Sequence, residues 1–249
     1  TRPSRTASPS TPSNEKLTYL RYQLAQAFHT HLREPMNALD YLSANLDPSS
    51  AIGVHEASVT LVEQMLVTYC DGSDESLEVR DLGCSLLDVV YAVENNWMAR
   101  IHLLEKRIED ADEPELKAGH YLEIARFFEL DGTHTREAFE AVQSGLEQGY
   151  HLLNLSDEFE RLSEQLDLWG ETASFLYTRL TEQLDVEDED RLSMVKRVAR
   201  LFEHKLQDLH TAIAVYEFGK QEAPDELIYL RELNRLYELT SQPEALVNI

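Results

Sequence analysis

No stretch of the 249 residues stays apolar over the length that a membrane-spanning helix needs. Residues 1–13 also lack the apolar centre of a signal peptide. From these two absences we expect no membrane insertion and a cytoplasmic location. Because the chain opens on Thr1 rather than methionine and stops at Ile249 inside a predicted helix, we also expect it to be a piece of a longer protein.

Cysteine is scarce, and the motifs of common catalytic sites are missing. Cys70 and Cys84 form no CxxC pair, whereas a disulfide framework needs more cysteines and a structural zinc site needs four clustered ligands. We expect both to be buried or half-buried free thiols. The nine histidines include no HExxH pair, and neither a glycine-rich phosphate loop nor a GxSxG motif occurs. We therefore expect no metal, no cofactor and no enzymatic activity.

Positive charge is also scarce. The chain has 22 Lys and Arg against 46 Asp and Glu, a net charge of −24, and only 6 of the 22 are lysine. So acidic a surface repels phosphate backbones, which excludes nucleic acid as an expected partner. The acidity has two open explanations: a high-salt habitat, or the ordinary surface of a large helical protein. The acidic runs 109–113 and 187–190 are interpreted as solvated turns and helix caps rather than a cation site.

Glycine and proline are few, at 9 and 8, and fall mostly at the ends of segments with apolar residues every three or four positions. Residues 1–13, rich in Ser, Thr and Pro, are interpreted as a linker or tail. Residues 14–249 predict an all-α fold that is least regular at 51–95. The predicted helices cover residues 14–32, 35–46, 54–70, 79–95, 97–110, 114–130, 134–148, 156–167, 169–184, 189–204, 208–222, 226–240 and 242–249.

Helix starts are predicted from prolines and small polar residues. Proline suits the first helical turn, whose N–H groups lack intrahelical partners, and Asp or Ser side chains cap such N–H groups. The prolines near predicted starts are Pro35, Pro48, Pro114, Pro224 and Pro243, and the predicted caps are Asp112, Asp157, Asp208 and Ser241.

A sequence repeat runs through much of the chain. The stretch Tyr121–Gly145 matches Val195–Gly219 at an offset of 74 residues. The matched pairs are Ala125 with Ala199, Phe128 with Phe202, Ala138 with Ala212, and Gly145 with Gly219. A third copy, 100 residues before the first, consists of Ala25, Phe28 and Ala38, with Asn45 at the glycine position. Repeats at such periods are typical of stacked helical hairpins.

A second repeat, at an offset of 72, interleaves with this one. It pairs Trp97, Leu104, Arg107 and Ile108 with Trp169, Leu176, Arg179 and Leu180. The small residues of the first repeat have a physical role, because two antiparallel helices can approach closely only where their side chains are small. We predict that Ala199 and Ala212 lie buried at one helix–helix contact. We also predict that Gly219 admits the next helix, which Pro224 starts.

This constellation resembles the tetratricopeptide repeat (TPR) family, in particular its divergent bacterial-type members. Val198, Ala199 and Phe202, followed by Ala212, Tyr216, Gly219 and Pro224, match the family pattern, with a turn one residue longer. Tyr121–Gly145 is a second match. Asp157–Leu184 matches poorly in its first helix, and Arg179 replaces a small residue, so looser packing is expected there. The resemblance implies a right-handed α-solenoid of stacked antiparallel helix hairpins.

The resemblance also implies a binding groove, because the first helices of TPR hairpins line a concave surface. The implied groove residues are Tyr22, Gln26, Arg126, Lys196 and Arg200. Their cations could hold an acidic peptide segment or a C-terminal carboxylate through charge-assisted hydrogen bonds. The alternative is internal neutralisation, in which these cations pair with neighbouring acidic helices. The asparagines of the family's chaperone-binding clamp are missing from these faces.

Together these features predict a non-catalytic scaffold or adaptor that binds a protein or peptide and assembles a complex. The alternative is a regulatory or sensor module of a larger polypeptide that controls a kinase, protease or transcription domain.

Overall fold

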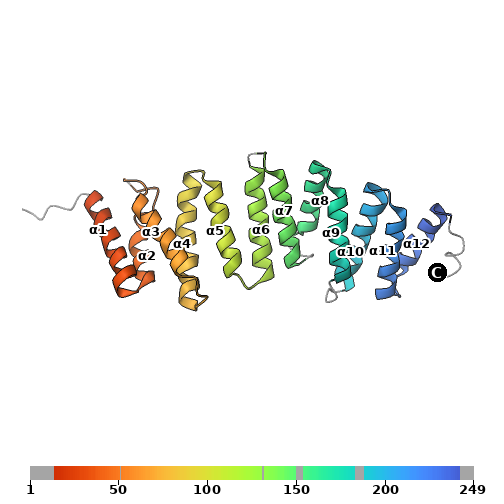
Figure 1. Cartoon of the computed structure of the whole chain (residues 1–249), viewed down its shortest axis with the longest axis horizontal. Helices are drawn as coiled ribbons and strands as arrows, with labels where there is room; N and C mark the ends of the chain where they lie inside the picture. Colours follow the sequence, from red (N-terminus) through yellow and green to blue (C-terminus); the bar gives the residue numbers. More distant parts are fainter. Residues whose placement is uncertain (1–13, 51, 131, 150–153, 183–187, 242–249) are drawn as a thin grey trace, which may run out of the picture. The chain divides into compact units, whose positions relative to one another are not determined.

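The computed structural model describes residues 14–50, 52–130, 132–149, 154–182 and 188–241 (Figure 1). Over these residues the chain is all-helical, without a strand. Two five-residue π-helical segments, η1 (Phe28–Leu32) and η3 (Leu201–Lys205), extend α1 and α10. The α-helices are α1 (Asn14–Ala27), α2 (Pro35–Ser43), α3 (Glu56–Thr68), α4 (Asp74–Val93), α5 (Trp97–Asp110), α6 (Pro114–Glu129), α7 (Thr135–Gln148), α8 (Leu155–Leu166), α9 (Trp169–Glu182), α10 (Asp188–Arg200), α11 (Leu209–Glu222) and α12 (Leu227–Leu239).

The helices predicted from periodicity are confirmed over the described residues, and α5 has the predicted bounds. The largest error is the start of α4, which begins at Asp74 rather than residue 79. The cause is Ser73, whose side chain accepts a hydrogen bond from the Ser76 N–H at 3.3 Å and so caps the helix. The predicted tail 1–13 and last helix 242–249 lie outside the described residues.

The predicted helix starts are partly right. Pro35 and Pro114 each occupy the first position of a helix, and Asp208 caps α11 by accepting the Thr211 N–H at 3.0 Å. Asp157 is not a cap, because it lies in the first turn of α8 and binds an arginine instead. Pro224 lies in a turn three residues before α12, so it precedes that helix rather than starting it.

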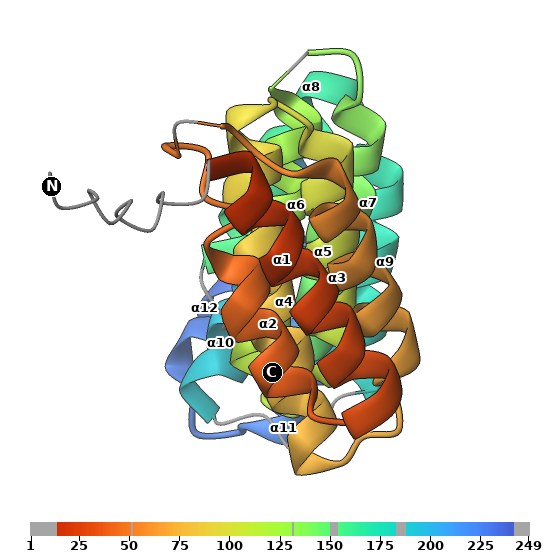
Figure 2. The same ribbon diagram turned by 90° about the vertical axis from the view of Figure 1, so that its left-hand side faces the viewer.

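The helices form two compact units, Thr1–Phe127 and Phe128–Ile249. In the first unit, α1, α2 and α3 pack against one another (Figure 2). Their buried side chains continue through α4 as one core, in which Leu39, Leu42 and Leu87 are inaccessible to solvent. Arg80 of α4 is buried and forms ion pairs with Asp110 at 2.6 Å and Glu109 at 3.1 Å, which join α4 to α5. Part of the acidic run 109–113 is therefore an ion-pair partner rather than a solvated turn.

In the second unit, α7 packs on α8 and α10 on α11, which in turn packs on α12. Phe139 of α7 stacks on Phe159 of α8 with ring centroids 4.4 Å apart. Gly219 of α11 lies where α12 approaches most closely, since a Cβ at this position would be 2.9 Å from the Tyr229 ring and from the Val195 side chain. The prediction that Gly219 admits the next helix is confirmed.

The small residues of the repeat are buried as predicted. All six alanines of the three copies are at most 1% exposed: Ala25, Ala38, Ala125, Ala138, Ala199 and Ala212. The residue after the first alanine of each copy is exposed: Gln26, Arg126 and Arg200. In each copy, therefore, the first alanine is packed in the core and the residue after it faces solvent.

In two of the three copies, a π-helical segment lies between the paired alanines. A π-turn closes through an i→i+5 hydrogen bond and so contains one more residue than an α-turn. The Arg33 N–H bonds to the Phe28 carbonyl, and the Leu206 N–H bonds to the Leu201 carbonyl at 3.1 Å. In the first and last copies the extra residue therefore lies in the last turn of the first helix. In the middle copy α6 has no π-helical segment, and a loop follows Glu129.

Two arginine-centred ion-pair groups repeat at the offset of 74 in the second unit. In each, an arginine bonds to a glutamate 3 residues earlier on its own helix and to a glutamate 32 residues earlier in the chain. The groups are Arg161 with Glu158 and Glu129, and Arg235 with Glu232 and Glu203. Each planar guanidinium reaches two helices at once, so these groups tie α8 to α6 and α12 to η3.

We predict that Ala212→Leu lowers the free energy of unfolding by about 1–3 kcal/mol, because the larger side chain overpacks the contact between α10 and α11. Ala214→Leu on the same helix is the control, since Ala214 is exposed. Urea denaturation followed by circular dichroism measures both. Equal stabilities for the two variants would refute the packing role of Ala212.

We predict that Gly219→Ala destabilises the protein by roughly 1–3 kcal/mol, because its Cβ would collide with Tyr229 and Val195. Gly170→Ala is the matched helical control, since a Cβ there meets no atom within 4 Å. Without a collision, alanine in a helix is neutral or stabilising by up to about 1 kcal/mol. The melting temperature should therefore fall for Gly219→Ala, whereas for Gly170→Ala it should rise or stay unchanged. A shift to higher temperature for Gly219→Ala contradicts the prediction.

Candidate binding hollow

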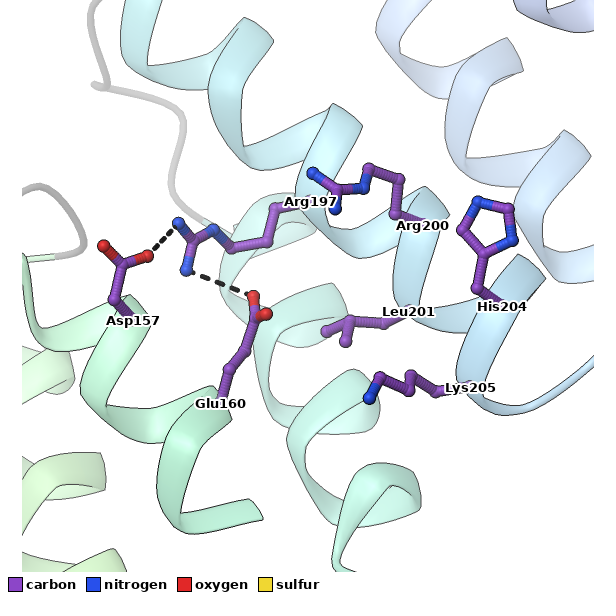
Figure 3. Close-up of a pocket in the computed structure, with 7 residues that line it drawn as sticks. All are labelled: Asp157, Glu160, Arg197, Arg200, Leu201, His204 and Lys205. Atoms are coloured by element: carbon purple, nitrogen blue, oxygen red, sulfur yellow. Dashed lines mark hydrogen bonds and ion pairs between the residues drawn. The ribbon is translucent and has the colours of Figure 1, made fainter. Parts of the chain in front are cut away.

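A hollow of 270 Å³ lies in the second unit between α8 and the end of α10 with η3 (Figure 3). We call it the α8–α10 hollow. Its lining residues are Asp157, Glu160, Arg197, Arg200, Leu201, His204 and Lys205. Three permanent cations against two carboxylates give the lining a net charge of +1 in a chain of net charge −24. The hollow is therefore a local positive feature on an acidic protein.

The basic wall of the hollow consists of Arg197, Arg200, His204 and Lys205. Residues spaced three and four apart share one face of a helix, and Arg197, Arg200 and His204 follow that spacing through the end of α10 and η3. The π-turn continues this face to its last residue, Lys205. The wall is thus a direct consequence of sequence spacing on a single helical segment.

Arg200 is an exposed cation of this wall. Among the described residues, no hydrogen bond or ion pair to its guanidinium is formed, and in Figure 3 no dashed line leaves it. A planar guanidinium offers five N–H donors in a fork that matches both oxygens of a carboxylate. Arg200 is therefore positioned to bind an anionic group from solution.

The acidic wall consists of Asp157 and Glu160, on the first two turns of α8. Both carboxylates face Arg197: its Nη2 is 2.5 Å from Asp157 Oδ1, and its Nη1 is 3.1 Å from Glu160 Oε1 (Figure 3). One guanidinium thus faces two carboxylates. The part of the hollow next to α8 keeps a net negative charge, whereas the part next to η3 is positive.

Lys205 closes the rim of the basic wall. Its Nζ lies 3.9 Å from the centroid of the Trp169 ring, a cation–π contact, and 3.3 Å from Glu164 Oε1. The indole of α9 and the carboxylate of α8 together hold the ammonium in place. Lys205 therefore contributes charge to the hollow with less freedom than a lysine that makes no such contacts.

Glu203 fixes the other side of the π-turn. It is buried and bonds through both oxygens to Arg235 of α12, each at 2.7 Å. These hydrogen bonds from Arg235 lower the pKa of Glu203 against the opposing effect of burial. His204, next in sequence, is exposed, with Nδ1 3.9 Å from Glu203 Oε1. Glu203 thus anchors the turn, and the adjacent His204 faces the hollow.

Of the residues expected in a groove, the hollow contains Arg200. Lys196 is half-buried and does not line it. Tyr22, Gln26 and Arg126 belong to the first unit, so the five-residue groove as a whole stays a prediction. Tyr22 is half-buried against the core and packs edge-on to His55 with ring centroids 5.5 Å apart, which favours a packing role. Gln26 and Arg126 are exposed.

Internal neutralisation, the alternative for the groove cations, does not hold for Arg200 among the described residues. Arg197, which was not among the predicted groove residues, is the cation that pairs with Asp157 and Glu160. Sequence reasoning missed Asp157 and Glu160 as site residues because Asp157 was interpreted as a cap. It also missed Glu203 and Arg235. Their signal was present, since all three members of the Arg235 group have identical counterparts 74 residues earlier.

The first unit contains hollows of a different character. One of 440 Å³ is lined by Leu77, Asp81, Arg107, Asp110, Ala111, Leu116 and His120. Burial lowers the pKa of His120. Cys84 is buried, which raises its pKa to about 11, whereas Cys70 is exposed, contrary to expectation. Within the described ranges, no cluster of three or more His, Cys, Asp or Glu could hold a metal ion.

Scanned against models of known protein families, the chain matches none, and no curated protein sequence matches it either. None of the helices in the described part of the chain combines the length and apolarity needed to span a membrane.

We predict that Glu203→Gln lowers the free energy of unfolding at pH 7 by roughly 1–3 kcal/mol, because Arg235 loses a charged acceptor. The folded-state pKa of Glu203 lies below its ordinary value of 4.5. Its stabilisation is therefore present above that pH and is lost as the pH falls through the folded-state value. The wild type should lose stability on acidification, and the variant should lose less.

Denaturant titrations from pH 7 to pH 3 measure this difference. Glu226→Gln is the control, because Glu226 is exposed and should leave the pH profile unchanged. Parallel profiles for the wild type and Glu203→Gln would show that the pair does not contribute to acid sensitivity.

Proposed function

We propose that this chain is a non-catalytic, TPR-like scaffold whose helix hairpins stack as a right-handed solenoid and bind an acidic protein segment or a C-terminal carboxylate. The buried alanines at a constant spacing support the hairpin assignment. So does the glycine at which the next helix approaches. The repeated ion-pair groups support stacking, because each ties a helix to the first helix of the preceding hairpin.

The observation that carries the binding proposal is Arg200. It is an exposed arginine without a partner among the described residues, in a net-positive hollow of a strongly acidic chain. The field of such a site guides an anionic ligand toward it, while the acidic remainder repels that ligand. The charge-assisted hydrogen bonds that Arg200 can donate then hold the anion.

The size of the hollow supports a peptide rather than a cofactor. At 270 Å³ it is smaller than the roughly 300–1,000 Å³ typical of small-molecule sites. A space of this size suits one side chain or one chain end. The remainder of a peptide ligand would lie along the neighbouring helices.

We predict that Arg200→Ala weakens the binding of a fluorescein-labelled octaglutamate peptide by about tenfold, the effect of losing one charge-assisted contact. It should also flatten the dependence of the dissociation constant on salt. Fluorescence anisotropy at 20–300 mM NaCl measures both. Because Arg200 is exposed, the melting temperature should not change.

Arg231→Ala is the matched control, because Arg231 is an exposed arginine of α12 outside the hollow. Equal losses of affinity in both variants would indicate general charge attraction and contradict the site. A lower melting temperature with unchanged affinity for Arg200→Ala would show that Arg200 is structural.

A further inference from the structure

The α8–α10 hollow has two poles of opposite charge. Arg197 is shared between Asp157 and Glu160, so the α8 side has one carboxylate charge in excess. Arg200 and His204 lie on the α10 and η3 side without a carboxylate of the acidic wall paired to them. A ligand that entered with negative charges alone would meet Arg200 favourably and the excess carboxylate unfavourably.

We infer that the hollow selects a segment carrying both charges: an acidic group for Arg200 and a basic group for Asp157 and Glu160. This inference rests on the proposed function and names its ligand more closely. The acidic wall is the specificity element, because repulsion between like charges lowers the affinity for a wrong partner.

The geometry provides a reason why the acidic wall stays available to a ligand. Glu160 is 3.1 Å from Arg197 Nη1 but shares that guanidinium with Asp157, which makes the shorter contact of 2.5 Å. The Asp157 side chain is 69% exposed, so a basic group from solution can reach it. Each carboxylate has oxygens that can accept from a second donor. An incoming ammonium or guanidinium therefore adds to the Arg197 contacts rather than displacing them.

Three labelled octapeptides test this inference: one of glutamate alone, one of lysine alone, and one in which pairs of glutamate and lysine alternate. The wild type should bind the mixed peptide roughly three- to fivefold more tightly than the glutamate peptide, the size expected for one exposed ion pair. Asp157→Asn with Glu160→Gln should reverse this order, because it removes the carboxylates that repel an acidic ligand and attract a basic one.

Asp225→Asn is the control, because Asp225 is exposed in the turn before α12, outside the hollow. Each single variant, Asp157→Asn and Glu160→Gln, should shift the preference part of the way, which keeps the test valid should the double variant fold poorly. An unchanged order in these variants, with affinity still lost in Arg200→Ala, overturns the two-pole inference but leaves the proposed function. Binding of the glutamate and mixed peptides that Arg200→Ala leaves unchanged overturns both.

Discussion

Close approach of helices at residues with little or no side chain is the constraint on which the rest of this structure depends. The paired alanines of each copy are buried, and Gly219 leaves room for the Tyr229 ring of the next helix. An added methyl group at such a position collides with its neighbours, so these positions fix the distance between helices. That distance in turn brings Arg161 and Arg235 within reach of glutamates 32 residues earlier.

The ion-pair groups add a defined orientation to the helix contacts that close packing forms. Apolar contacts are non-directional and tolerate small sliding of one helix on another, whereas a bidentate guanidinium contact has one geometry. Glu203 is buried and paired through both oxygens, so α12 and η3 are held in register as well as in contact. A pair of this kind is costly to break from one side, because the remaining charge stays partly buried.

Helix positions were predictable because they depend on local spacing, and the buried alanines because they recur at a fixed separation. The π-turns were not, because an added residue can lie in the loop or in the helix, and the i→i+5 hydrogen bonds to the Phe28 and Leu201 carbonyls show where it lies. Only part of the α8–α10 hollow could be predicted from the sequence. Arg200 follows from its place after Ala199, but the opposing carboxylates come from a helix about 40 residues earlier in the chain, where the sequence predicts a cap at Asp157 and gives no signal for Glu160.

The π-turn connects stability with recognition, because its consecutive residues face opposite ways. Glu203 faces α12, where Arg235 holds it, while His204 and Lys205 face the hollow. The Arg235 contacts of Glu203 on one side, and the Trp169 and Glu164 contacts of Lys205 on the other, restrain this turn. The wall is thus preorganised, which reduces the entropy lost when a ligand binds.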